Sequence, residues 1–147
     1  MHWQRTFMHP MLAGFDAPSR EECTADRFQS NSPQQALTLL NDPSFVEAAR
    51  GFALRLNREK PGAGDAEKIQ HALRIALSRE AKPAEIESLT AFVAERRKFY
   101  QSKPEDAKAF LKTGLSDPGA GQDPVELAAW AQLCRVILNL HETITRY

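Results

Sequence analysis

The residues with the greatest capacity for chemistry are concentrated near the start of the sequence, between Asp16 and Asn31. Cys23 is the best nucleophile in this stretch, and Asp16 is one of several carboxylates around it. If these side chains converged on one concave pocket, they would form the site of a hydrolytic or redox enzyme. The enzyme hypothesis for this chain therefore rests on five residues: Asp16, Arg20, Cys23, Arg27 and Asn31.

Local chemistry argues against a catalytic cysteine in this stretch. Glu21 and Glu22 precede Cys23, and adjacent carboxylates disfavour the thiolate that attacks a substrate. The sequence contains no GxSxG nucleophile elbow and no glycine-rich phosphate loop of the required form. Asp16 is instead predicted to cap a short helical turn, and Ser19 with Glu22 fits a capping box for the same turn. For the remaining polar residues the simpler explanation is a buried network that holds this segment to the rest of the fold.

The spacings of common metal and haem sites are absent from the sequence. None of the four histidines stands four residues from another, and neither CxxC nor CxxCH occurs. We therefore expect no metal or other cofactor in this chain. Two cysteines, Cys23 and Cys134, are too few for a disulfide scaffold, and we interpret both as small, mostly buried apolar residues. A disulfide between the two stays open.

Helix-start signals recur beyond residue 32 and indicate the elements that must position these side chains. Proline suits the first helical position, where its missing N–H costs nothing. Five helices are predicted to start at Pro33, Pro43, Pro83, Pro104 and Pro124. Capping side chains are predicted in front of four of them: Ser32 (with Gln35), Asp42, Ser102 and Asp123. Asp65 is predicted to cap one more helix, and the glycine-rich stretch 113–122 reads as a mobile surface loop.

The apolar residues of these segments recur at three- and four-residue intervals, and no segment alternates with period two. This pattern predicts an all-α fold: an irregular helical bundle of about five to seven helices with an extended, loop-rich N-terminal arm. We expect residues 1–147 to form a single helical domain, with arm 1–31 packed on the helices of 32–147. The arm must pack, because its large apolar side chains would otherwise lie in water: Trp3, Phe7, Phe15 and Phe28. The last helix is predicted to carry one apolar face from Leu127 through Cys134 to His141.

Composition excludes several classes of partner. Nineteen basic residues balance nineteen acidic ones, whereas a nucleic-acid binder usually carries a basic excess. The one basic cluster, Arg96–Lys98, is better explained as a solvated helix face, so no nucleic acid is expected. No apolar run reaches the roughly 20 residues of a membrane-spanning helix. The first residues lack the continuous apolar region of a signal peptide.

Several strings resemble one family over nearly the whole chain and in the same order. They are WQRTFMHPML, FDAPSREECT, NSPQQALTLLNDPSFVEAAR and AAWAQLCRVILNLHETITR. They are similar to the C-terminal domain of large planctomycete envelope or secreted proteins, known as domain of unknown function 1553. Two positions depart from the family pattern: Asp26, where basic residues are typical, and Gln34, where leucine is favoured.

The resemblance implies an architecture rather than an activity. Such domains end a longer protein that often carries a cytochrome c-like module, so this chain is expected to be a C-terminal fragment of a larger multidomain protein. It also implies export to the periplasm, the envelope or the medium. The expected partners are other domains of the parent protein, including a cytochrome c-like module, or an envelope protein. An apolar patch involving Trp3, Phe7 or Trp130 would favour packing against a haem module.

Two hypotheses for function follow. The leading one is a non-catalytic structural or protein-interaction module at the C-terminal end of a larger exported protein. The alternative is part of an enzyme whose site includes the Asp16–Asn31 arm. The second requires these side chains to converge on a pocket, and it weakens if they are engaged in caps and internal pairs.

Overall fold

The computed structural model describes residues 8–19, 23–26, 30, 32–118 and 121–144. Within these residues the chain forms eight helices and no strand, which confirms the all-α prediction. The chain divides into two compact units, residues 1–38 and residues 39–147, which are described separately. The prediction that the arm packs on the helices stays a prediction.

The first unit holds a short helix that the sequence patterns did not predict, α1 (Pro10–Gly14), and the first residues of α2 (Pro33–Asn41). Pro10 stands in the first turn of α1, where the Nδ1 atom of His9 accepts a hydrogen bond from the Met11 N–H at 3.3 Å. The predicted helical turn after Asp16 is wrong, because residues 17–19 are not helical. The capping box of Ser19 with Glu22 involves a residue outside the described ones.

The capping box that starts α2 is confirmed. The Oγ atom of Ser32 accepts a hydrogen bond from the Gln35 N–H at 3.3 Å, and the Oε1 atom of Gln35 accepts one from the Ser32 N–H at 3.2 Å. Each side chain thereby satisfies a backbone donor that has no partner inside the helix.

The second unit contains most of the helices. They are α3 (Pro43–Glu59), α4 (Asp65–Leu77), α5 (Pro83–Ser102), α6 (Pro104–Leu111), α7 (Pro124–Leu138) and α8 (His141–Ile144). All five predicted proline starts are confirmed. Asp42 and Asp123 cap their helices as predicted, by accepting hydrogen bonds from Ser44 at 2.9 Å and Val125 at 3.1 Å.

Two predicted caps are wrong. Gly64, and not Asp65, occupies the capping position of α4. Asp65 lies in the first turn, where its carboxylate accepts hydrogen bonds from both terminal nitrogens of Arg97. At the start of α6, Lys103 occupies the capping position without a side-chain bond. The Ser102 hydroxyl donates instead to the carbonyl of Phe99, at 2.7 Å. In both places another partner outcompetes the local cap.

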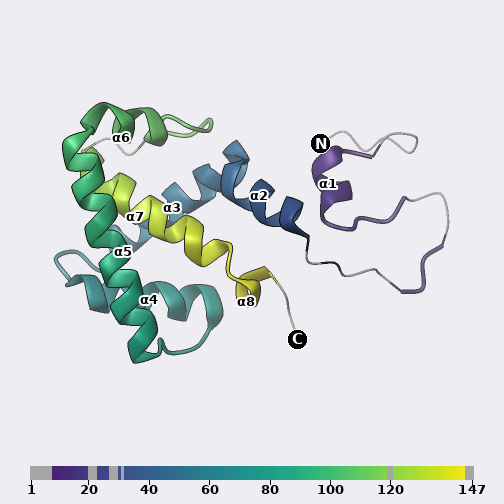
Figure 1. Ribbon diagram of the computed structural model, residues 1–147, viewed down its shortest axis with the longest axis horizontal. Helices are drawn as coiled ribbons and strands as arrows, with labels where there is room; N and C mark the ends of the chain where they lie inside the picture. Colours follow the sequence, from purple (N-terminus) through teal and green to yellow (C-terminus); the bar gives the residue numbers. More distant parts are fainter. Residues whose placement is uncertain (1–7, 20–22, 27–29, 31, 119–120, 145–147) are drawn as a thin grey trace. The chain divides into compact units, whose positions relative to one another are not determined.

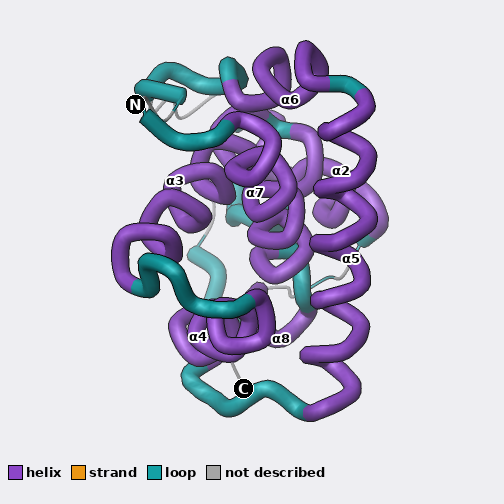
Figure 2. The backbone as a smooth tube through the Cα atoms, turned by 90° about the vertical axis from the view of Figure 1, so that its left-hand side faces the viewer, coloured by secondary structure: helices purple, strands orange, loops and turns teal. Residues whose placement is uncertain are grey.

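Helix α7 lies at the centre of the second unit, with α3, α5 and α6 around it (Figures 1 and 2). Its side chains are buried on nearly every face, as expected of a helix enclosed by others. The buried ones are Leu127, Ala128, Ala129, Trp130, Ala131, Leu133, Cys134 and Ile137. The predicted apolar face ends early, because α7 stops at Leu138 and the exposed His141 begins α8.

A polar network joins α4, α5 and α7 at the edge of this core. Arg97 binds Glu126 through Nε at 2.6 Å and through Nη2 at 2.8 Å, and it also binds Asp65. The hydrogen bonds that Arg97 donates to Glu126 and Asp65 raise its pKa above the ordinary value. Glu126 also accepts the indole N–H of Trp130 at 2.8 Å. Arg97 therefore has a structural role, and the basic cluster of residues 96–98 does not present three unengaged cations to a phosphate backbone.

Candidate functional site

The structure describes two of the five residues on which the enzyme hypothesis rests. Arg20, Arg27 and Asn31 lie outside the described residues, whereas Asp16 and Cys23 lie within them. Cys23 carries a free, exposed thiol, so the prediction that it is buried is wrong.

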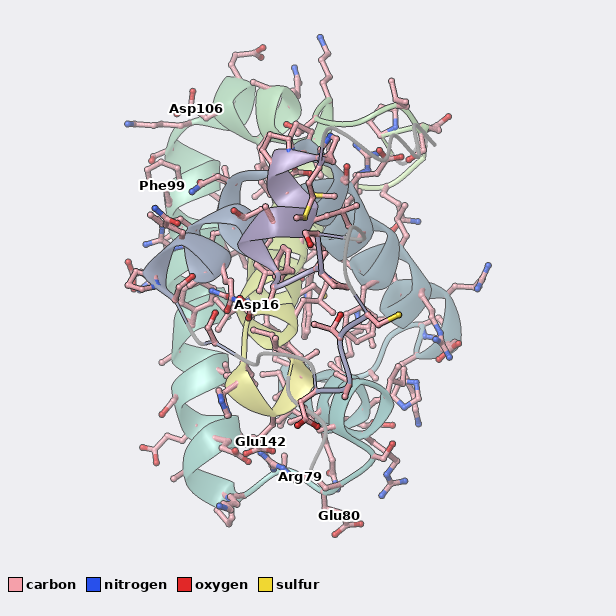
Figure 3. The ribbon with its side chains drawn as sticks, turned by 90° about the vertical axis from the view of Figure 1, so that its right-hand side faces the viewer. Asp16, Arg79, Glu80, Phe99, Asp106 and Glu142 are labelled. Atoms are coloured by element: carbon pink, nitrogen blue, oxygen red, sulfur yellow. The ribbon has the colours of Figure 1, made fainter. Side chains whose placement is uncertain are left out.

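The carboxylate of Asp16 organises its own segment (Figure 3). Its Oδ2 atom accepts hydrogen bonds from the Ser30 N–H and hydroxyl, both at 2.7 Å, and from the Gln35 amide at 3.3 Å. The pKa of Asp16 lies below its ordinary value, mainly because Ser30 donates these hydrogen bonds to the charged carboxylate. Asp16 itself adopts a left-handed backbone conformation, with φ of 57°. Its role is to tie the segment after α1 to the start of α2.

A cavity of about 380 Å³ lies beside Asp16, and none of its described lining residues supplies the base or the oxyanion donor that acyl transfer requires. Its polar lining comes from Asp16, Ser19, Thr24 and Asp26, and Cys23 is not among its lining residues. Two carboxylates without a neighbouring base or oxyanion donor do not activate a hydroxyl. The described members of the predicted site therefore do not converge.

The described part of the chain offers neither a metal site nor a membrane-spanning helix. It contains no group of three or more histidine, cysteine, aspartate or glutamate side chains placed to hold a metal ion. None of its helices combines the length and the apolar character that crossing a bilayer requires.

A second cluster, which the sequence patterns did not single out, lies where α3 meets the chain leaving α6. Arg50 of α3 is 2% exposed. Its Nη1 atom donates to the carbonyls of Leu111 and, at 2.9 Å, of Thr113. Its Nη2 atom donates to the carbonyl and the hydroxyl of Ser116, at 3.1 Å and 2.7 Å. A guanidinium satisfies several backbone carbonyls at once because its donors fan out in one plane.

Glu47, one turn earlier on α3, binds the other side of the same loop. Its two carboxylate oxygens accept the N–H groups of Leu115 and Ser116, each at 2.9 Å. Hydrogen bonds from Ser116 and Leu115, together with the charge of Arg50, hold the pKa of Glu47 below its ordinary value. We call residues 112–118, which Glu47 and Arg50 hold together, the clamped loop.

Gly114 allows the side chain of Glu47 to pack against the clamped loop. Its φ is 103°, a conformation that L side chains rarely adopt. A Cβ atom at this position would lie 2.3 Å from the Oε2 atom of Glu47, which no real contact tolerates. The glycine is therefore required both by the backbone and by the carboxylate packed against it.

The clamped loop holds an apolar side chain in solvent. Leu115 is fully exposed, with a relative accessibility of 102%. Its backbone N–H is bound by Glu47, and the next residue is bound by both Glu47 and Arg50. Leu115 is thus presented on an ordered backbone rather than at the end of a free loop.

A pocket of about 310 Å³ opens beside the clamped loop, between the end of α6 and the start of α7. Four of its lining residues are apolar: Leu111, Pro118, Pro124 and Leu127. Lys108 and Lys112 line it as well and supply its charged groups. The loop, Leu115 and this pocket together form the candidate functional site.

Sequence patterns missed this site because its partners are far apart in the chain. Arg50 and the carbonyls that it binds are separated by more than sixty positions. The signal that was present is Glu47 and Arg50, a charged pair three residues apart on a face that also buries Ala49 and Ala53. A cation on a buried face requires a partner, but the pattern does not say which one.

Comparison with known proteins gives one result. The family described as "PSD1: Protein of unknown function (DUF1553)" matches residues 1–93, which include both Glu47 and Arg50. Neither a search of curated proteins nor a search of solved structures returned a match. Because the match spans well over half of the chain, this protein belongs to the DUF1553 family.

Proposed function

We propose that this chain is a non-catalytic protein-interaction module of a larger exported protein, and that the clamped loop is the element that docks. The observation that carries the proposal is Leu115, which is fully exposed on a backbone held by Glu47 and Arg50. Burying one leucine side chain stabilises a complex by roughly 1.5–3 kcal/mol.

Preorganisation supports the same proposal. Single exposed apolar residues are common on protein surfaces and need no explanation by themselves. Here, however, four hydrogen bonds from Arg50 and two to Glu47 hold the surrounding backbone in one conformation. A docking element that is ordered before binding loses less conformational entropy when the complex forms.

The state of the N-terminal stretch favours this function over the enzyme alternative. Asp16 is engaged with Ser30 and Gln35, and Cys23 does not line the neighbouring cavity. These contacts support a structural role for the described part of the stretch. The proposed interaction module requires no cofactor in this chain.

The parent-chain context of the proposal rests on the resemblance. We place the module at the C-terminal end of an exported protein, with a cytochrome c-like module or an envelope protein as the expected partner. Of the residues expected in a docking patch, Trp130 is fully buried and cannot take part, and Trp3 and Phe7 lie outside the described residues. Within the described part of the chain we therefore assign the contact with such a partner to the clamped loop.

The test is a capture experiment with the full-length parent protein and its Leu115→Asp variant, expressed in the native cells. A protein enriched by the unmodified chain and lost with Leu115→Asp is purified, and its affinity for the isolated chain is measured by calorimetry. Leu37→Asp is the matched control, because Leu37 is 58% exposed on a different element. Equal binding by Leu115→Asp and the unmodified chain would contradict the proposal.

A further inference from the structure

We infer that the pocket between α6 and α7 binds the C-terminal residue of a partner polypeptide. An aliphatic side chain would enter the pocket, and the terminal carboxylate would bind Lys112 and Lys108. The inference rests on the proposed function, because it names the part of the partner that docks beside Leu115.

The interior of the pocket suits an aliphatic side chain. Leu111 and Leu127 are 4% and 1% exposed, so they form a floor that is continuous with the core. Pro118 and Pro124 add apolar walls that carry no N–H donor. The volume of about 310 Å³ lies at the small end of the range for ligand sites, roughly 300–1,000 Å³. It therefore suits one residue better than an extended segment.

The charged groups of the pocket suit a carboxylate. Lys108 and Lys112 are four residues apart at the end of α6, so they lie on the same face. Lys108 binds Glu105 at 2.9 Å, in a pair whose side chains are 53% and 81% exposed. Such a pair contributes little to stability and can exchange for another anion. Lys112 forms no salt bridge within the described part of the chain, although its charge helps Lys108 to lower the pKa of Glu105.

The geometry favours a chain terminus over an internal acidic residue. An aspartate or glutamate carries its charge at the tip of the side chain, which would have to enter the apolar pocket. A C-terminal residue places an aliphatic side chain and a carboxylate on the same α-carbon, so one can be buried while the other meets the lysines. Capture of a terminal carboxylate is a known mode of peptide recognition.

The wall of the pocket exists before any ligand binds. Pro118 lies two residues after Ser116, the last residue of the segment that Arg50 and Glu47 hold. The side chain of Asp123 caps α7 and fixes the other wall at Pro124. A preformed pocket loses little entropy on binding and can distinguish side chains by size.

The test uses the full 147-residue chain and a fluorescein-labelled peptide, Gly-Ser-Gly-Ser-Gly-Leu, with a free carboxylate. Its binding is followed by fluorescence anisotropy. The same peptide with a C-terminal amide should bind about tenfold more weakly, because a charge-assisted hydrogen bond is lost. A peptide ending in glycine should also bind more weakly, because the apolar contact is lost.

Matched variants locate the site. Lys112→Met removes the charge but keeps an apolar stem, and it should weaken binding of the free-acid peptide while leaving the amide peptide unchanged. Lys98→Met is the control, because Lys98 is an exposed lysine of α5 that does not line the pocket. On binding, the backbone amide NMR signals of Leu111, Gly121 and Leu127 should shift. Equal affinity for acid and amide, or shifts confined to other residues, would overturn the inference.

Two further arms separate the possible explanations. Octanoate that competes with the peptide at equal affinity would show that the site takes free aliphatic acids, and this would overturn the assignment to a chain terminus. The capture experiment with Leu115→Asp tests the proposed function independently of the short peptide, since Leu115 does not line the pocket. If the peptide fails to bind but a Leu115-dependent partner exists, the inference fails while the proposed function stands.

Discussion

Arg50 shows how one side chain can determine the path of a segment far away in sequence. It is 2% exposed, and its Nη2 atom lies 3.9 Å from a carboxylate oxygen of Glu47, beyond hydrogen-bond distance. Its charge is therefore solvated mainly by carbonyl oxygens of Leu111, Thr113 and Ser116. In return, those carbonyls obtain the donors that a chain leaving a helix lacks.

We expect Arg50→Met to destabilise the chain by about 3 kcal/mol, because it leaves several partly buried carbonyls without donors. The free energy of unfolding in urea measures the effect. Arg55→Met is the control on the same helix, because Arg55 is 49% exposed and forms a surface pair with Glu59. If Arg50→Met lowered the free energy of unfolding as little as Arg55→Met, the hydrogen bonds of Arg50 to the clamped loop would not stabilise the fold.

The two glycines Gly51 and Gly114 should respond in opposite directions to alanine. Gly51 lies inside α3, where an added Cβ would meet nothing within 4 Å. Gly51→Ala should stabilise the chain by about 0.5–1 kcal/mol, because alanine loses less entropy in a helix. Gly114→Ala should destabilise it by about 1–2 kcal/mol, because of its positive φ and its contact with Glu47. Thermal unfolding of the two variants measures both signs, and equal signs would contradict this account.

At the scale of elements, Arg79 fastens α8 to the turn between α4 and α5 (Figure 3). It binds both carboxylate oxygens of Glu85, at 2.7 Å and 2.9 Å, and it binds Glu142 through Nε at 2.7 Å. Glu85 also accepts the backbone N–H of Lys82, at 2.7 Å, and so caps the start of α5. One guanidinium in the turn after α4 thereby joins α5 to α8.

This contact predicts a defined sensitivity to acid. The hydrogen bond from Arg79, then that from Lys82, lowers the pKa of Glu85 from an ordinary value of 4.5 to about 2. Because the folded pKa lies below the unfolded one, the stabilisation is complete above the unfolded pKa and is lost as pH falls toward 2. The free energy of unfolding in urea should fall less between pH 4.5 and about 2 for Glu85→Gln than for the unmodified chain. Arg79→Met should reduce the same dependence, because only Lys82 then lowers the pKa of Glu85. A steeper loss of stability with falling pH in either variant would contradict the assignment.

Element starts were the most predictable part of the fold. The fixed φ of a proline favours the first position of a helix, so a helix start can be predicted without information from the rest of the chain. This is the case at Pro33, Pro43 and Pro83. Asp16 and Asp65 were assigned to caps wrongly, because an aspartate at such a position also suits a distant donor. Here Ser30 and Arg97 provide those donors.

The candidate site could not be predicted for the same reason. The bonds that Glu47 and Arg50 make with Thr113, Leu115 and Ser116 join α3 to a segment that follows α6. No local sequence pattern encodes that pairing. Glycines and a proline in stretch 113–122 correctly indicated a surface loop. They did not indicate that its first half is bound to a buried arginine.

At the scale of the whole molecule, the second unit contains its own core. The buried apolar cluster extends from Ala49 to Ile137, and all of its members lie within residues 39–147. Core residues of one unit that pack on one another are what an independently folding domain requires.

A chain of residues 39–147 should therefore unfold cooperatively on its own. Circular dichroism during heating should show a single helical transition, with a midpoint within a few degrees of that of the full chain. Residues 1–38 serve as the complementary fragment, whose described part contains no cluster of fully buried apolar residues. A broad, non-cooperative transition of the 39–147 fragment would show that the two units depend on each other.

Because Cys134 is buried, the reactivity of its thiol can report local or global unfolding around α7. Cys134 is 0% exposed on α7, and burial raises the pKa of its thiol far above the ordinary value, whereas Cys23 is exposed. A thiol reagent added to the native chain should therefore modify one sulfur promptly and the other only when the central helix becomes accessible. The rate of the slow step would count openings of the core at physiological temperature, without denaturant and without an engineered probe.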